Sequence, residues 1–266
     1  MATPFLKWAG GKRWLVKNHE NLLPDKFNTY FEPFLGSAAV FFHLEPKEAV
    51  LSDANPHLIE CYQAIKDDWR LVLRYLKDHQ RKHEKDYYYE IRAKKFKSRF
   101  TRAAKFIYLN RTCYNGLYRE NLKGIFNVPI GTKTAVVLDT DDFEQTSILL
   151  GYADLKQCDF SETISRAQVD DFIFVDPPYT VAHNNNGFVK YNQNIFSWGD
   201  QERLKADLEE ATNRGVKLLI TNADHSSIQK LYNGFGNKSA LSRHSKVSGL
   251  GKGRKKTTEL LISIGT

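Results

Sequence analysis

Residues 171–179 read DFIFVDPPY, a short apolar run followed by an acid, two prolines and an aromatic ring. The apolar run is typical of a strand that is buried on both faces. Pro177 and Pro178 cannot donate hydrogen bonds and hold φ near one value, so the strand ends there. The Asp176 carboxylate and the proline carbonyls predict a rigid pocket of acceptors, and Tyr179 can stack on a planar base. An ordinary Pro-Pro turn needs neither the acid nor the ring, so the stretch favours a pocket for an aromatic amine.

On both sides of this stretch, apolar runs alternate with amphipathic segments. Asn55 is predicted to cap a helix that has Pro56 in its first turn, where the missing N–H costs nothing. The alternation predicts an α/β fold whose mostly parallel sheet is covered by helices on both faces. Strands are predicted at 29–31, 49–52, 172–175, 216–221 and 259–264, and helices at 87–97, 102–109 and 200–213.

Residues 57–138 interrupt this alternation, so we expect a helical subdomain there, inserted into a core formed by 1–56 and 139–266. The inserted part also carries the charge: residues 81–123 hold thirteen Lys and Arg against four acids, which exceeds the net +8 of the whole chain. Tyrosines such as Tyr88, Tyr108 and Tyr114 are interleaved with these cations. Basic charge mixed with aromatic rings favours nucleic acid as the partner over a solvated helix face.

The bulk composition narrows the remaining classes of protein. With 266 residues and 41% hydrophobic content, the chain suits one large domain or a core with an inserted subdomain. It has no apolar run long enough for a bilayer, and its start lacks the layout of a secretory signal. Cys61, Cys113 and Cys158 are odd in number and far apart, which argues against disulfides or a zinc site. We therefore expect a cytoplasmic protein that uses no metal and has no membrane association.

Two loops suit a nucleoside cofactor. Residues 31–38 read FEPFLGSA, a strand followed by a small-residue loop, and Asp53 ends the next strand, where a carboxylate can accept hydrogen bonds from a ribose. The dinucleotide pattern G-x-G-x-x-G is not present, which favours a cofactor without a pyrophosphate and disfavours an oxidoreductase. Residues 5–12 read FLKWAGGK, where paired glycines between an indole and a lysine indicate a close approach of backbone to a ligand. An ordinary turn glycine and a helix cap remain the alternatives for Gly36 and Asp53.

Five motifs then occur in order: FLKWAGGK at 5–12, FEPFLG at 31–36, YNGLYR at 114–119, FNVP at 126–129 and DPPY at 176–179. With them the chain resembles the Dam-type (class α, D12) DNA adenine-N6 methyltransferases along nearly its whole length. The resemblance implies a Rossmann-like methyltransferase fold with an inserted helical DNA-recognition subdomain. It also implies S-adenosylmethionine as cofactor, S-adenosylhomocysteine as product and double-stranded DNA as partner, with no obligatory protein partner.

The resemblance implies roles residue by residue. Catalysis would fall to Asp176, Pro177, Pro178 and Tyr179. The cofactor would contact Trp8, Gly10, Lys12, Phe34, Leu35, Gly36, Asp53, Asp159, Phe160 and Asp176. DNA recognition would involve Lys7, Tyr114, Asn115, Leu117, Arg119 and Pro129, with the tyrosine wedged into the base stack. One departure is that Ala38 stands where the family usually has a second glycine.

Two further expectations concern DNA. The basic run 243–256, which contains Arg254, Lys255 and Lys256, contains no acid and is predicted to clamp the DNA backbone, unless it is a solvated loop. The match of Lys7, Leu117, Arg119 and Pro129 to relatives that methylate the adenine of GATC predicts that site or a related one.

The alternatives within methyltransferases are cytosine-N4 and protein-glutamine enzymes, which usually have Ser or Asn before the prolines; Asp176 favours adenine. From another class, an inactive DNA-binding relative is disfavoured by the intact Asp176, Tyr179, Asp53 and Trp8.

Overall fold

The computed structural model describes residues 2–116, 118–121, 124–181, 196–244 and 256–266. The chain divides into two compact units: the first is Met1–Lys17 with Leu35–Cys158, and the second is Asn18–Phe34 with Asp159–Thr266. Seven strands within the described residues follow the order β3-β2-β1-β4-β5-β7-β6. The pairs β2–β3, β1–β4 and β4–β5 are parallel, and β7 is antiparallel to both β5 and β6. The predicted α/β fold with a mostly parallel sheet is confirmed.

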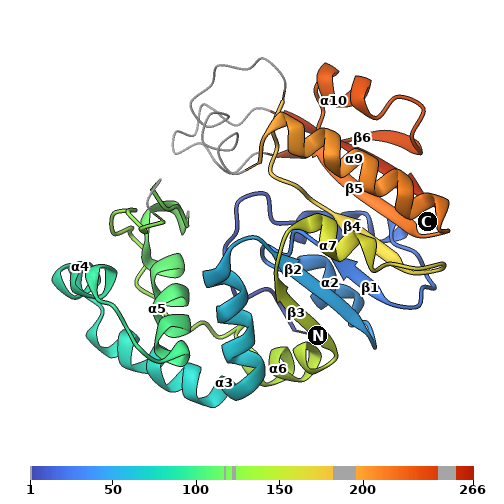
Figure 1. Ribbon diagram of the computed structural model, residues 1–266. Helices are drawn as coiled ribbons and strands as arrows, with labels where there is room; N and C mark the ends of the chain where they lie inside the picture. Colours follow the sequence, from blue (N-terminus) through green and yellow to red (C-terminus); the bar gives the residue numbers. More distant parts are fainter. Residues whose placement is uncertain (1, 117, 122–123, 182–195, 245–255) are drawn as a thin grey trace. The chain divides into compact units, whose positions relative to one another are not determined.

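The first unit combines two parallel strands with most of the helices. Asn55 caps α3 as predicted, because its Oδ1 accepts from the backbone N–H groups of His57 and Leu58. Helices α3 and α5 pack side by side, and α3 also packs on α6 (Figure 1). The elements are α1 (Arg13–Asn18, which runs one residue past this unit), α2 (Ala39–Leu44), β2 (Ala49–Asp53), α3 (Pro56–Lys82), α4 (Lys85–Ala93), α5 (Arg99–Thr112), η2 (Tyr114–Gly116), α6 (Phe143–Gly151) and β3 (Ala153–Gln157).

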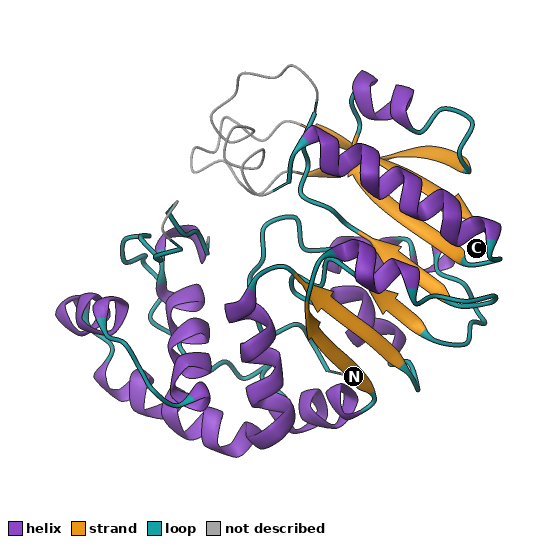
Figure 2. Ribbon diagram, viewed as in Figure 1, coloured by secondary structure: helices purple, strands orange, loops and turns teal. Residues whose placement is uncertain are grey.

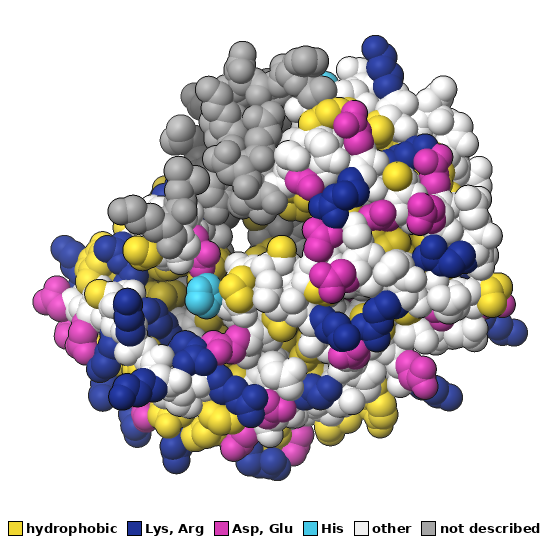
Figure 3. Space-filling view, viewed as in Figure 1, with side chains coloured by type: hydrophobic (Ala, Val, Ile, Leu, Met, Phe, Trp, Pro, Cys, Tyr) yellow, Lys and Arg dark blue, Asp and Glu magenta, His cyan; other side chains and the backbone are white. Residues whose placement is uncertain are grey.

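The surface of α3, α4 and α5 is basic, but two of its tyrosines belong to the core. Lys and Arg side chains gather over these helices (Figure 3). Tyr88 and Tyr108 are fully buried. The Tyr88 hydroxyl donates to the Val128 carbonyl at 3.0 Å, and the Tyr108 ring stacks on His79 with 4.8 Å between centroids. The expectation that these two rings serve nucleic acid was wrong, because they pack the helices together.

The second unit contains the remaining five strands together with α7, α9 and α10 (Figure 2). Ser197 and Asp200 form a capping box that starts α9, and α9 packs on α7. The elements are η1 (Glu20–Leu22), β1 (Tyr30–Glu32), α7 (Phe160–Ser165), β4 (Phe172–Val175), α9 (Trp198–Asn213), β5 (Lys217–Ala223), α10 (Ser226–Leu231), β6 (Asn237–His244) and β7 (Lys256–Ile264). Strands β3 and β6 were not predicted from the sequence.

Candidate active site

The DPPY motif lies directly after β4 in the second unit, and two neighbouring strands hold it. All four residues of β4 are buried, and the motif begins at the residue that follows this strand. The hydroxyl of Thr221, on β5, donates to Asp176 Oδ1 at 2.8 Å. The hydroxyl of Tyr179 donates to Oε2 of Glu259, on β7, at 2.8 Å. Both ends of the motif are therefore tied to the sheet by side chains.

The electrostatics of this group keep the tyrosine protonated. Burial raises the pKa of Tyr179 well above its usual value, and the negative charges of Asp176 and Glu259 raise it further. A hydrogen bond to Thr221 acts in the opposite direction. Tyr179 therefore remains a hydrogen-bond donor at neutral pH.

Three phenylalanines form a cluster at the start of α7 in the same unit. Phe160 stacks on Phe34 with 5.4 Å between ring centroids, and Phe196 lies 5.6 Å from both. The Arg203 guanidinium lies 4.1 Å from the centroid of the Phe160 ring. Arg203 also grips both carboxylate oxygens of Asp159, at 2.5 and 3.0 Å, which holds the pKa of Asp159 below its usual value. Arg203 therefore connects the phenylalanine cluster to Asp159.

In the first unit, a glycine turn sits between Trp8 and Asp53. Gly36 has φ of +47°, and a Cβ there would lie 2.8 Å from Trp8 Cδ1, so only glycine fits. Its N–H donates to Asp53 Oδ2 at 3.1 Å, while the Asn55 N–H donates to Oδ1 at 2.9 Å. Burial raises the pKa of Asp53, and these hydrogen bonds offset part of the rise. The structure therefore brings Trp8, Gly36 and Asp53 together.

The neighbouring residues of these loops are largely buried. Leu35 and Lys12 are each only 2% exposed, and the Lys12 ammonium donates to the Gly10 carbonyl at 2.7 Å. The Trp8 indole is half-buried and stacks on Tyr118 with 6.0 Å between centroids. Ala38, the departure from the family pattern, adopts a left-handed conformation with φ of 54°. The backbone therefore keeps a conformation that favours glycine although the residue is alanine.

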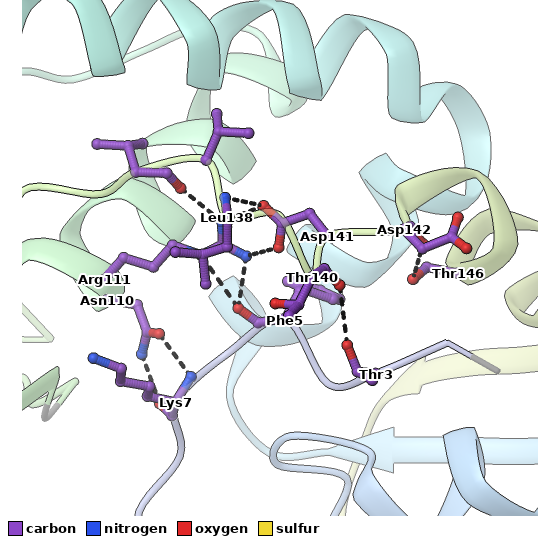
Figure 4. Close-up of polar contacts among 12 residues, drawn as sticks. Thr3, Phe5, Lys7, Asn110, Arg111, Leu138, Thr140, Asp141, Asp142 and Thr146 are labelled. Carbon is purple, nitrogen blue, oxygen red and sulfur yellow. Dashed lines mark hydrogen bonds and ion pairs between the residues drawn. The ribbon is translucent and has the colours of Figure 1, made fainter.

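Two residues at the end of α5 hold the N-terminal loop (Figure 4). Asn110 accepts from the Lys7 N–H at 2.9 Å and donates to the Lys7 carbonyl at 2.7 Å. Arg111 donates to the Phe5 carbonyl at 2.9 Å and forms a bidentate pair with Asp141, both bonds being 2.6 Å. Motif analysis missed these residues, and it counted Arg111 among the DNA-binding cations. That count was wrong for Arg111, which is 2% exposed and is committed to Asp141.

The residues expected to recognise DNA lie just beyond this point and are mostly exposed. Tyr114 is 56% exposed, and its N–H is held by the Pro129 carbonyl at 2.9 Å. Asn115 is exposed with φ of 57°, and Arg119 is exposed with a 3.4 Å hydrogen bond to Asn127. Their side chains are available to a ligand.

Lys7 is exposed beside this segment, in contact with Gly116. A Cβ at Gly116 would lie 2.5 Å from Lys7 Cδ. Burial, and then the nearby charge of Lys133, lower the pKa of Lys7. Leu117, Arg254 and Lys255 fall outside the described residues, as does the side chain of Lys256, the first residue of β7. The predicted clamp at 243–256 therefore stays a sequence prediction.

Two kinds of feature are absent from the described residues. They contain no group of three or more His, Cys, Asp or Glu side chains placed to hold a metal ion. None of the described helices has the length and apolar character needed to cross a membrane.

Comparisons with known proteins agree with this geometry. The family described as D12 class N6 adenine-specific DNA methyltransferase matches residues 8–247. The type II methyltransferase M1.LlaDCHI of Lactococcus lactis subsp. cremoris is 37% identical, over 87% of this chain and 85% of the relative. The type II methyltransferase M.MjaIII of Methanocaldococcus jannaschii is 35% identical, over 90% and 91%. A DNA adenine methylase of Vibrio cholerae is 34% identical, over 97% and 94%. With its motifs ordered and anchored in this way, the chain belongs to the D12 class of N6 adenine-specific DNA methyltransferases.

Proposed function

We propose that this methyltransferase acts on an adenine that is flipped out of duplex DNA, in GATC or a related site, with Asp176, Pro177, Pro178 and Tyr179 as its catalytic group. The observation that carries the proposal is the anchoring of the motif. Thr221 fixes Asp176 and Glu259 fixes Tyr179, so an acceptor and a stacking ring are held at the end of β4 before substrate arrives. Preorganised polar groups of this kind often supply the largest part of catalysis.

The chemistry required of these residues is to expose a lone pair. The amino group of adenine is a poor nucleophile because its lone pair is delocalised into the ring. Hydrogen bonds from both N–H groups, one to the Asp176 carboxylate and one to the Pro177 carbonyl, localise that pair and orient it. Asp176 then takes up the proton that becomes acidic once the nitrogen is methylated. Tyr179 stacks on the base and holds it in place.

The family implies S-adenosylmethionine as the donor, whose sulfonium supplies an electrophilic methyl group and which leaves as S-adenosylhomocysteine. The residues present suit it. Gly36 gives a turn without a side chain, packed against the Trp8 indole, and Asp53 offers a carboxylate for the ribose hydroxyls. We assign Asp159 and Phe160 to its adenine. The other proposed contacts are Gly10, Lys12, Phe34 and Leu35, and no metal is required.

For DNA we assign residues 57–138 as the target-recognition subdomain. Extruding a base costs a few kcal/mol, which phosphate contacts offset and which Tyr114 reduces by filling the gap. Arg119 suits a bidentate contact to guanine, and Lys7, Asn115 and Pro129 flank it. Leu117 and the Arg254–Lys255–Lys256 run complete the proposed interface. We place the enzyme in the cytoplasm, at the nucleoid, without an obligatory protein partner.

The test is methyl transfer to defined duplexes, followed by modification-sensitive sequencing of DNA exposed to the enzyme. We expect N6-methyladenine in GATC or a related sequence. Asp176→Ala should lower turnover by roughly 10³-fold while cofactor affinity is largely retained. Asp154→Ala is the control, because Asp154 is an exposed residue of β3 outside the proposed site, and its rate should match the parent enzyme. Substantial turnover by the Asp176 variant would refute the assignment, and a product other than N6-methyladenine would refute the proposed chemistry.

A further inference from the structure

Glu259 is a buried carboxylate in a strand that no motif marks. Glu259 is only 2% exposed, and so is as buried as its apolar neighbours Leu260 and Leu261. Burying a carboxylate is unfavourable unless it is hydrogen-bonded. One bond that it accepts comes from the hydroxyl of Tyr179, at 2.8 Å. Glu259 is therefore hydrogen-bonded to Tyr179, the last residue of the DPPY motif, which lies eighty positions earlier in the chain.

The register of the sheet explains why Glu259 and Thr221 act on the same motif. In the antiparallel pair β5–β7, Thr221 lies opposite Leu261, and Ala223 lies opposite Glu259. Residues two apart on a strand share a face, as do residues directly opposite each other. Thr221 and Glu259 therefore project from the same face of the sheet, one toward Asp176 and the other toward Tyr179.

We propose that Glu259 is a positioning residue for methyl transfer, which sets the orientation of the Tyr179 ring against the flipped base. The inference rests on the proposed function of the motif. A tyrosine ring tied at its hydroxyl as well as at Cβ loses its freedom to rotate away. The stacking surface is then in place when the base arrives, and no ordering is required at that step.

The chemical identity of the partner matters for this role. A carboxylate oxygen of Glu259 accepts the hydrogen bond, and the Tyr179 hydroxyl donates it. Glutamine at this position still has a carbonyl oxygen of nearly the same geometry, whereas leucine has no acceptor. The raised pKa of Tyr179 agrees with this arrangement, because the hydroxyl keeps its proton.

The experiment is a double-mutant cycle with Glu259→Leu, Tyr179→Phe and the combined variant, alongside Glu259→Gln. Single-turnover methyl transfer is measured together with the dissociation constants for cofactor and DNA. A duplex with 2-aminopurine at the target position reports base extrusion and stacking. Thermal unfolding checks that each variant is folded. Thr258→Val, an exposed neighbour on β7, is the matched control and should transfer methyl groups at the parent rate.

If Glu259 acts through Tyr179, Glu259→Leu and Tyr179→Phe should each slow methyl transfer roughly 10- to 100-fold. The combined variant should be no slower than either one, because both remove the same hydrogen bond. Cofactor affinity should stay within about threefold, the 2-aminopurine signal should change, and Glu259→Gln should recover most of the rate.

Multiplicative losses in the combined variant would overturn the inference, as would a Tyr179→Phe enzyme that transfers methyl groups at the parent rate while Glu259→Leu does not. Either result would leave the proposed function standing. Failure of the parent enzyme to methylate adenine would instead refute the proposed function itself. If Glu259→Leu does not fold, the comparison of Glu259→Gln with Tyr179→Phe still decides, since a Gln variant as slow as the Phe variant excludes a role that depends on the acceptor alone.

Discussion

The motif segment 176–179 and the recognition segment 114–129 differ in what holds their side chains. In the motif segment, Asp176 and Tyr179 are tied by hydrogen bonds to side chains of β5 and β7. In the described part of the recognition segment, the fixed bonds are mainly those of the backbone, such as the one from the Tyr114 N–H to the Pro129 carbonyl. The Tyr114 side chain itself is 56% exposed.

If the two segments act as proposed, the residues for chemistry are fixed and those for recognition are exposed. A reacting group gains from being fixed before the substrate arrives, because no reorganisation is then required. Side chains that meet bases must reach into a groove whose shape varies, so their freedom has a use. The recognition segment nevertheless starts from a rigid base, the Arg111–Asp141 pair at the end of α5.

The largest effect on stability is expected for the Arg111–Asp141 pair. Arg111→Ala leaves the Asp141 carboxylate buried without its cation, which should lower the free energy of unfolding by about 3–5 kcal/mol. Arg70→Ala is the control, because its ion pair with Glu144 is exposed and should contribute at most about 1 kcal/mol. Denaturant unfolding measures both. Equal losses of unfolding free energy in the two variants would show that the Arg111–Asp141 pair contributes no more stability than an exposed ion pair.

A smaller effect is expected at the exposed side chain. Tyr114→Ala should weaken DNA binding or base extrusion by about 1–3 kcal/mol, through lost stacking. The free energy of unfolding should change by no more than about 0.5 kcal/mol, because the side chain is exposed. Tyr152→Ala, at a tyrosine that is 57% exposed outside the recognition segment, should change neither quantity. A stability loss at Tyr114 would contradict the division between fixed and free side chains.

The smallest effect is expected from pH at Asp159. Arg203 lowers the pKa of Asp159, so the stabilising contribution is present above the ordinary value of 3.8 and is lost as the pH falls through the lowered value. Both partners are exposed, so Asp159→Asn should cost at most about 1 kcal/mol at pH 7 and should match the parent protein at the acidic end. Unfolding measured across acidic pH tests this. A difference that grows toward low pH would contradict the sign.

Asp53 should show the opposite sign to Asp159. Burial raises its pKa, so its favourable contribution is present below the ordinary value of 3.8 and is lost as the pH rises. Ionising the buried Asp53 carboxylate therefore costs stability. Comparing Asp53→Asn with Asp159→Asn over the same pH range distinguishes an acid whose pKa is raised by burial from one whose pKa is lowered by an ion pair.

Local signals predicted the elements whose causes lie close together in the sequence. The apolar run alone predicts strand β4, and the prolines after it predict where the strand ends. Asn55 alone predicts where α3 begins. Strand β3 was missed because four of its five residues are at least partly exposed, and β6 was missed because NKSALSRH is mostly polar. Tyr88 and Tyr108 were wrongly expected to face nucleic acid, because the sequence of a highly charged segment does not indicate which of its rings are buried. Glu259 was missed because its importance comes from strand register, which no short motif encodes.

The position of β7 has a consequence for how the protein forms during synthesis. Strand β7 comes last in the chain order, yet it lies between β5 and β6 in the sheet. Until it emerges, β5 presents an open edge and β6 has no neighbour, which is the kind of exposed strand that promotes aggregation. The same late strand carries Glu259. The hydrogen bond between Tyr179 and Glu259 can therefore form only after β7 has joined the sheet.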